Sequence, residues 1–182
     1  VNRFNGYAGT NGFIEGRSQF NMLAFAVGGS VELFLDGNAT VFGSEFSSEY
    51  DSRDVDKMSN GSDNFAIDDK QAHTLIVDTR PGVTNNDTIH YDMALLKYQN
   101  FRLKFYTENF ISNVQAWLLD KYLQTETPLN TSGDTSSYDF SISANPASKA
   151  ADRFKVVFKQ SVVVPVTFIT VSASRNANKT IT

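Results

Sequence analysis

The sequence contains no cysteine. Disulfides, thiolate nucleophiles and cysteine metal ligands are therefore excluded, and the stability of the fold depends on its apolar core. The sequence also has no apolar run of about 18 residues that could cross a bilayer as a helix. The first residues lack the charged start and apolar stretch of a signal peptide. If the protein is exported, we expect its signal to lie upstream or to have been removed.

Basic segments are also missing. The 16 Lys and Arg residues stand against 20 Asp and Glu residues, which gives a formal net charge of -4 at pH 7. Without a basic run to follow a phosphate backbone, we expect no nucleic-acid partner, and without a spanning segment we expect no membrane insertion. The chain has 182 residues, of which 41% are hydrophobic and 13% aromatic. That length and apolar content fit one domain with a substantial core.

Short alternating or β-branched segments separated by turn residues predict an all-β fold. The first expected hairpin joins residues 19–26 to 30–35 through Val27-Gly28-Gly29, where glycine can adopt a positive φ. Further strands are expected at 39–42, 73–77, 94–97, 101–106, 114–120, 138–144 and 153–159, with a turn at 36–38 and one helical turn at 147–151. This pattern favours an antiparallel β-sandwich of the jelly-roll type over alternating βαβ units.

Two regions fall outside this regular pattern. Residues 43–69 are polar and rich in turn residues, so we expect a long connection there, anchored by Phe46 or Tyr50, and we expect another loop at 125–134. A β-rich run at 162–172 is interrupted by Pro165, which a central strand would not tolerate. We therefore expect a sandwich module over residues 1–160, and in 161–182 a linker or the first strand of an immunoglobulin-like module.

No spacing in the sequence indicates catalysis. His73 and His90 are the only histidines, and neither is spaced with a second ligand or with a Gly-x-Ser-x-Gly elbow. A triad of distant Ser, His and Asp residues is disfavoured because nothing marks a nucleophile with its base. We therefore assign no catalytic residue and do not expect an enzyme.

Carboxylates gather in the long polar connection. Asp51, Asp54 and Asp56 carry hard oxygen ligands of the kind that suit Ca²⁺. The segment nevertheless lacks the Asp-x-Asp-x-Asp-Gly order and terminal Glu of an EF-hand loop, and Asp often caps turns without a metal. We favour a solvated turn and keep calcium as the alternative. No other cofactor is expected.

Aromatic residues on the expected strands could stack on a sugar ring. Most such residues pack in the core or pair across strands. Trp117 alternates with Ala116 and Leu118, so it points outward if those two face the core. We name Trp117 the first candidate for ligand binding, followed by Tyr122 and Tyr98.

Several motifs in the second half of the chain share an order with a known family. These are the run 114–123 with its Trp-Leu-Leu-Asp, then Thr127-Pro128-Leu129-Asn130, Tyr138-Asp139-Phe140 and Asp152-Arg153-Phe154. In this order the sequence resembles a β-sandwich module of Bacteroidetes surface proteins, and upstream the Tyr-Asp-x-x-Asp-x-x-Lys segment at 50–57 fits the same pattern. The resemblance implies export, with an immunoglobulin-like unit following and type IX secretion through a sorting domain that is not part of this chain. It implies no reaction.

Asp87-Thr88-Ile89 matches the short pattern on which Bacteroidetes attach O-linked glycans, and predicts a sugar on Thr88 in an exposed loop.

These observations predict a non-catalytic module of a secreted or cell-surface protein, acting in adhesion or as a structural spacer. Its partners would be surface glycans or other surface proteins. The first alternative is a carbohydrate-binding module with an aromatic platform, with or without a calcium ion that stabilises it. The second is a hydrolase acting on polysaccharides, which would need carboxylates converging in a cleft.

Overall fold

The computed structural model describes residues 17–110 and 113–160. In these residues the chain is all-β, and its one helical element is the short 3-10 helix η1 (Pro146–Lys149). The expected all-β class and the helical turn near residue 147 are confirmed. The expected linker at 161–182, with the run 162–172, lies outside the described residues.

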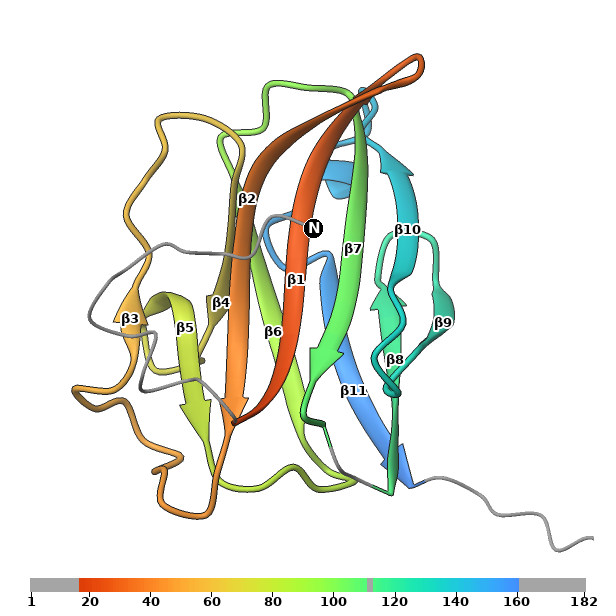
Figure 1. Ribbon diagram of the computed structural model, residues 1–182. Helices are drawn as coiled ribbons and strands as arrows, with labels where there is room; N and C mark the ends of the chain where they lie inside the picture. Colours follow the sequence, from red (N-terminus) through yellow and green to blue (C-terminus); the bar gives the residue numbers. More distant parts are fainter. Residues whose placement is uncertain (1–16, 111–112, 161–182) are drawn as a thin grey trace, which may run out of the picture.

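The described chain forms one sheet of eleven strands. In chain order these are β1 (Ser18–Gly28), β2 (Val31–Phe42), β3 (Val55–Asp56), β4 (Asn64–Asp68), β5 (Thr74–Arg80), β6 (Thr88–Ala94), β7 (Asn100–Glu108), β8 (Val114–Asp120), β9 (Thr125–Leu129), β10 (Ser136–Ser141) and β11 (Phe154–Gln160). The strand order is β10-β7-β1-β2-β5-β4-β6-β11-β8-β9, and β3 pairs with β5. The sheet curls so that β2, β1, β7 and β10 lie in front of β4, β6, β11 and β8 (Figure 1).

The sheet is mixed, which differs from the purely antiparallel pairing that we expected. Ala39–Phe42 of β2 runs parallel to Val77–Arg80 of β5, whereas the other strand pairs are antiparallel. A parallel pair needs a crossover connection, and residues 43–73 supply it, carrying β3 and β4 on the way. The two ends of the strand order, β9 and β10, are consecutive in the chain, so the sheet nearly closes on itself.

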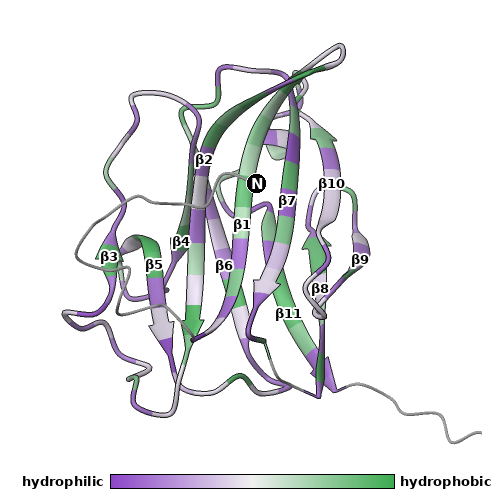
Figure 2. Cartoon of the chain, in the orientation of Figure 1, coloured by the Kyte–Doolittle hydropathy of each residue, from purple (hydrophilic) through white to green (hydrophobic). Residues whose placement is uncertain are grey.

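Alternating side chains build the core between the two halves of the sheet. Burial alternates residue by residue along β7 and β8, and the hydropathy alternates with it (Figure 2). Phe20 of β1 illustrates the packing, because its ring meets Phe105 of β7 at 6.1 Å and Phe158 of β11 at 5.6 Å between centroids. Such aromatic contacts from distant strands join the two halves of the sheet into one core.

Several expected boundaries were wrong. The turn expected at 36–38 lies inside β2, because buried Asp36 accepts hydrogen bonds from the backbone N–H groups of Gly37 and Phe65, both at 2.9 Å. The carboxylate thus has partners inside the protein and does not need a solvent-exposed turn. The strand expected at 94–97 is absent, because β6 ends at Ala94 and the next strand begins at Asn100. The loops expected at 43–69 and 125–134 contain strands β3, β4 and β9.

A buried arginine–aspartate pair joins the strands near the closing ends of the sheet. The Arg153 side chain donates from Nε and Nη2 to the two carboxylate oxygens of Asp120, at 3.0 and 2.7 Å, and both side chains are 1% exposed. Nη1 of Arg153 donates to the carbonyls of Ser141 and Ser148. The hydroxyl of Tyr138 donates to Asp120 at 2.9 Å. One ion pair therefore ties together β8, β10, η1 and the residue that precedes β11.

The ionised form of Asp120 is stabilised by these partners. Burial by itself raises the pKa of this carboxyl, but hydrogen bonds from Arg153, the Leu123 backbone and Tyr138 outweigh it. The pKa of Asp120 therefore lies below its ordinary value. A carboxyl with a lowered pKa in the folded state stabilises that state above its unfolded pKa, and the contribution disappears as the pH falls through the folded pKa.

We expect Asp120→Asn to lower the free energy of unfolding by about 3–5 kcal/mol at neutral pH, because Arg153 would keep a buried charge without its counter-ion. Urea unfolding followed by circular dichroism measures this difference. The gap between wild type and variant should begin to narrow as the pH falls below about 4, where Asp120 of the unfolded wild-type chain binds a proton, and should narrow further until the folded carboxyl is protonated at its lower pKa.

The matched control is Lys121→Met, which removes the exposed ion pair between Lys121 and Asp152. Exposed pairs of this kind contribute about 0–1 kcal/mol. Equal losses in the two variants would show that Arg153 and Asp120 do not organise the fold.

Candidate functional site

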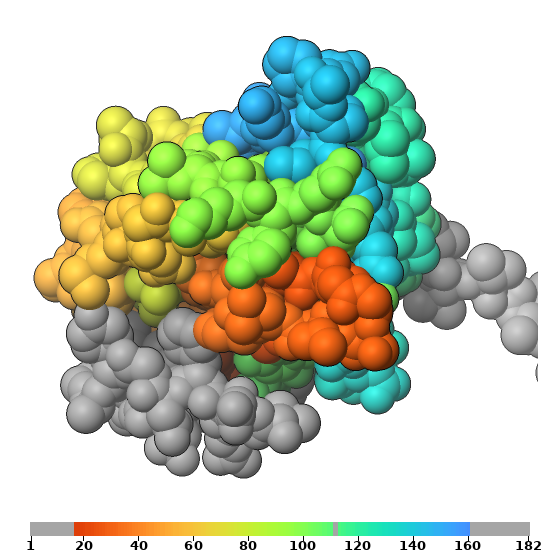
Figure 3. Space-filling model, turned by 90° about the horizontal axis from the view of Figure 1, so that it is seen from above, coloured from red at the N-terminus to blue at the C-terminus, as the bar shows by residue number. Residues whose placement is uncertain are grey.

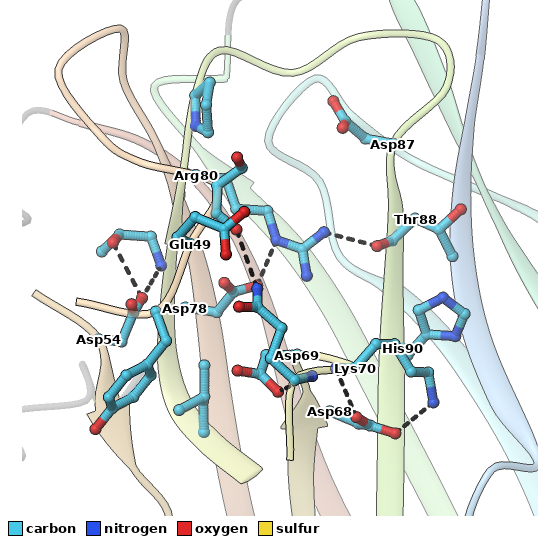
Figure 4. Close-up of a pocket in the computed structure, with 16 residues that line it drawn as sticks. Glu49, Asp54, Asp68, Asp69, Lys70, Asp78, Arg80, Asp87, Thr88 and His90 are labelled. Carbon is cyan, nitrogen blue, oxygen red and sulfur yellow. Dashed lines mark hydrogen bonds and ion pairs between the residues drawn. The ribbon is translucent and has the colours of Figure 1, made fainter. Parts of the chain in front are cut away.

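A polar cleft of about 330 Å³ lies beside β5 and the start of β6 (Figure 4). Its lining comes from four parts of the chain: the β2–β3 connection (Ser48, Glu49, Tyr50, Asp54), the last residue of β4 with the β4–β5 turn (Asp68, Asp69, Lys70, Gln71), β5 with its following residue (Leu75, Asp78, Thr79, Arg80, Pro81), and β6 with its preceding residue (Asp87, Thr88, His90). The crossover between the two parallel strands therefore places its polar side chains beside those of β5 and β6.

Asp78 and Arg80 form the central ion pair of the cleft. They are two residues apart on β5, so both side chains lie on the same face of the strand. Arg80 Nε donates to Asp78 Oδ2 at 2.6 Å, and Nη1 donates to the carbonyl of Thr88 at the same distance (Figure 4). Both side chains are largely buried, at 19% exposure for Arg80 and 7% for Asp78. The arginine thus links β5 to β6.

Most of the other carboxylates in the cleft hold turns. Asp54 Oδ1 accepts from the backbone N–H and hydroxyl of Thr79, and its Oδ2 accepts from the Asp51 backbone. Asp68 caps its turn through the Lys70 backbone and also pairs with the Lys70 ammonium. Asp87 accepts from the backbone and hydroxyl of Thr84. These carboxylates have structural partners, as Asp residues in turns commonly do.

An aromatic pair borders the cleft. The Tyr50 ring stacks on the His73 ring with centroids 3.8 Å apart and an interplanar angle of 10°. His73 Nδ1 lies 2.6 Å from Asp69 Oδ2, and the Tyr50 hydroxyl donates to Asp56 at 3.1 Å. Because Tyr50 is still 39% exposed, it offers a positioned aromatic surface beside polar groups.

The cleft is electrostatically negative. Six carboxylates line it, against one lysine and one arginine. Burial lowers the pKa of His90, helped by the nearby charges of Lys70 and Lys155, so its imidazole is neutral at pH 7. We expect such a site to repel anions and to accept neutral or positively charged ligands.

The balance between burial and hydrogen bonding shifts the pKa values of two carboxyl groups in the cleft in opposite directions. Burial raises the pKa of Asp78 above its ordinary value, although Arg80 acts in the opposite direction. For Asp69 burial also raises the pKa, but the backbone N–H groups of His73 and Gln71 outweigh it, and the pKa lies below the ordinary value. Asp78 is therefore the carboxyl of this pair that binds a proton more readily.

A second hollow, of about 550 Å³, lies at the turn after β8. It is lined by Tyr122, Leu123, Phe140 and Arg153 among others. Its charged groups already have partners, because Arg153 pairs with Asp120 and Asp139 pairs with Arg102. We take the first cleft as the candidate site because it gathers more polar groups, including six carboxylates and His90, beside the exposed Tyr50 ring.

The three aromatic candidates from the sequence do not form a common platform. Trp117 lies on the face of β8 that points away from the core, as expected if Ala116 and Leu118 face inward. Its side chain is half-buried, and Lys159 Nζ lies 4.8 Å from its ring centroid. Tyr122 stacks under Arg153 at 5.0 Å, and Tyr98 is 42% exposed on the β6–β7 connection. No ring contact joins any two of the three within residues 17–110 and 113–160. A binding role for them stays a prediction.

Asp51, Asp54 and Asp56 each have protein partners. Asp51 accepts from the Arg53 backbone at 2.7 Å, Asp54 holds Thr79, and Asp56 accepts from Tyr50. Across the described part of the chain, no group of three or more His, Cys, Asp or Glu side chains is arranged to hold a metal ion. These contacts fit the turn that we favoured, and calcium binding stays a prediction.

Thr88 does not lie in the exposed loop that we expected. It is the first residue of β6, it is half-buried, and its carbonyl accepts the hydrogen bond from Arg80. The reason is that β11 pairs with β6 at this position, with Val157 opposite Thr88. Glycosylation of Thr88 stays a prediction.

The sequence analysis did not identify the Asp78–Arg80 pair. An Asp-x-Arg pair on one strand was visible in the sequence, but such pairs are common on exposed strand faces and carry little information alone. Tyr50 was named only as a structural anchor; Phe46 takes that role, since it is 5% exposed. The parallel β2–β5 pairing that creates the cleft has no local sequence signal.

Comparison with known proteins identified no relative: no family model, no curated protein and no solved structure matches this chain. The resemblance to Bacteroidetes surface modules therefore stays a prediction. Residues 17–110 and 113–160 contain no helix that is long and apolar enough to cross a membrane.

We expect Arg80→Met to raise the pKa of Asp78 further, because the substitution removes the cation and the hydrogen bond that lower it. Carbon-13 NMR titration of the side-chain carboxyl groups measures the change. Asp92 is the internal control: burial raises its pKa too, without a contribution from Arg80. An unchanged Asp78 titration would show that the two side chains do not interact in solution.

Proposed function

We propose that this chain is a non-catalytic β-sandwich module of a secreted or cell-surface protein, and that its cleft binds a neutral or positively charged sugar. The observation that carries the proposal is the exposed Tyr50 ring, stacked on His73 beside a negative, hydrogen-bonding cleft. A planar ring beside converging polar groups is the usual composition of a small-ligand site.

The polar lining supports a saccharide as the ligand. Sugar hydroxyl groups both donate and accept hydrogen bonds, and this cleft offers carboxylates, a guanidinium, a neutral imidazole and the Gln71 amide. The excess of carboxylates disfavours uronic acids and sulfated sugars and favours an amino sugar. Adhesion to a glycan-coated surface would follow from such binding.

The partners of the carboxylates support binding rather than catalysis. Asp54, Asp68 and Asp87 hold turns, and Asp78 is paired with Arg80. A glycosidase needs one carboxylic acid and one carboxylate placed on either side of the scissile bond. Hydrolysis is nevertheless the second candidate, because Asp78 and Asp69 share a cleft and their pKa values shift in opposite directions.

We expect isothermal titration calorimetry to detect binding of neutral or amino-sugar oligosaccharides and no binding of oligouronates. Tyr50→Ala should raise the Kd about fivefold, since the loss of an aromatic contact costs on the order of 1 kcal/mol. Trp117→Ala is the matched control, because Trp117 is the other outward aromatic candidate and lies on β8, outside the cleft.

Three outcomes would contradict the cleft assignment. These are an absence of binding across all three sugar classes, binding of oligouronates alone, and binding that Trp117→Ala abolishes while Tyr50→Ala does not. Release of reducing ends during the titration, abolished by Asp78→Asn, would replace the binding function with the hydrolytic one.

A further inference from the structure

Exposed apolar side chains gather at one end of the molecule. Six of the eight large hydrophobic side chains that are exposed in the described ranges lie on three neighbouring segments, with exposures of 42% to 70%. We call these six the apolar end: Val31, Leu33 and Phe34 of the β1–β2 hairpin, Met58 of the β3–β4 connection, and Leu95 and Tyr98 of the β6–β7 connection. Monomeric proteins rarely concentrate exposed apolar residues in this way.

The three segments lie side by side. The hairpin and both connections reach the same end of the sheet (Figure 1), and seen from that end they form one continuous surface (Figure 3). Asp63 joins two of them, because its backbone N–H donates to the Leu95 carbonyl at 2.9 Å and its carboxylate accepts from the Lys97 backbone at 2.7 Å. The Asn60 amide donates to the Leu35 carbonyl of β2 at 3.4 Å. Buried and local hydrogen bonds therefore hold the apolar end in place.

A free strand edge runs through this surface. Among the described strands, β2 pairs with β1 from Val31 onward but with β5 only from Ala39 to Phe42. From Val31 to Phe34 the other edge of β2 therefore has no strand partner in the described residues. An unpaired edge with apolar side chains is a template for pairing with another strand.

The charge on this edge does not oppose pairing with an identical edge. Glu32 is its only charged residue, and it is neutralised by Arg102 at 2.6 Å and Lys104 at 2.5 Å. In an antiparallel pair related by a two-fold axis, opposite residues share one face of the sheet, so Leu33 would lie opposite Leu33, and Glu32 opposite Phe34, of the other copy. The two Leu33 side chains would then meet at the axis, and the two carboxylates would not face each other.

We propose that the apolar end is a self-association surface, on which a second copy of this chain pairs its β2 edge antiparallel with Val31–Phe34 of the first. The three segments of the apolar end carry two carboxylates and two lysines, whereas six carboxylates line the cleft against one lysine and one arginine. Two molecules with a net charge of -4 can therefore approach each other at this end with little repulsion. The dimer would present two clefts, one from each copy, and thereby increase avidity for a repeated surface glycan.

Analytical ultracentrifugation of the full chain tests this proposal. We expect a species of twice the 20.2 kDa chain mass at about 100 μM protein. Leu33→Lys should weaken the dimer at least tenfold, because it places one ammonium per copy in the apolar contact. Hydrogen exchange should show protection of the Val31–Phe34 amides that increases with protein concentration.

Leu123→Lys is the control, since Leu123 is 52% exposed against 51% for Leu33 and lies outside the apolar end. At protein concentrations low enough for the wild-type chain to be monomeric, both variants should retain its melting temperature, because neither side chain is buried in the monomer. A wild-type chain that stays monomeric at all concentrations would overturn the proposal, as would equal weakening by both variants. So would a monomer that floats with phosphatidylcholine vesicles, which would identify a lipid surface as the partner.

Discussion

The buried pair of Arg153 and Asp120 is the interaction on which the arrangement of the last four strands depends. Removing both charges from water is costly, and the cost is recovered only because each polar atom of the pair has a partner. Those partners come from β8, β10 and η1, so the pair can form only when these elements are correctly placed. The rings of Tyr122, Phe140 and Phe154 pack within about 5 Å of the guanidinium. A nearly closed sheet thus has a polar anchor where its ends approach each other.

Other buried carboxylates use the same physical solution at the opposite side of the sheet. Asp36 accepts from two backbone N–H groups and pairs with Lys57 at 3.0 Å, with both side chains nearly inaccessible. Asp63 accepts from the Lys97 and Tyr98 backbones. In each case a charged side chain in a strand or turn fixes a connection that is distant in sequence. These anchors explain how long polar connections can be ordered without a disulfide.

The two surfaces to which we assign functions by proposal have opposite chemistry, and the fold separates them. The parallel β2–β5 pairing brings the crossover over the face of β5 and creates the acidic cleft. The same pairing ends at Ala39, which leaves the first part of β2 unpaired on that side among the described strands. One topological feature therefore accounts both for the cleft and for the free edge at the apolar end. A sugar-binding module that also pairs through this edge would bind a glycan surface with two sites.

The sequence by itself determined the all-β class and most of the strands, and it put Trp117 on the strand face opposite Ala116 and Leu118, because alternation and turn residues are local signals. Local signals could not show that Asp36 lies inside a strand, since its partners Phe65 and Lys57 are more than 20 residues away. They also could not show the parallel pairing, the convergence of Asp78, Arg80 and His90, or the position of Thr88 within β6. Those features were decided by the tertiary structure, because each arises from contacts between segments that lie far apart in the chain.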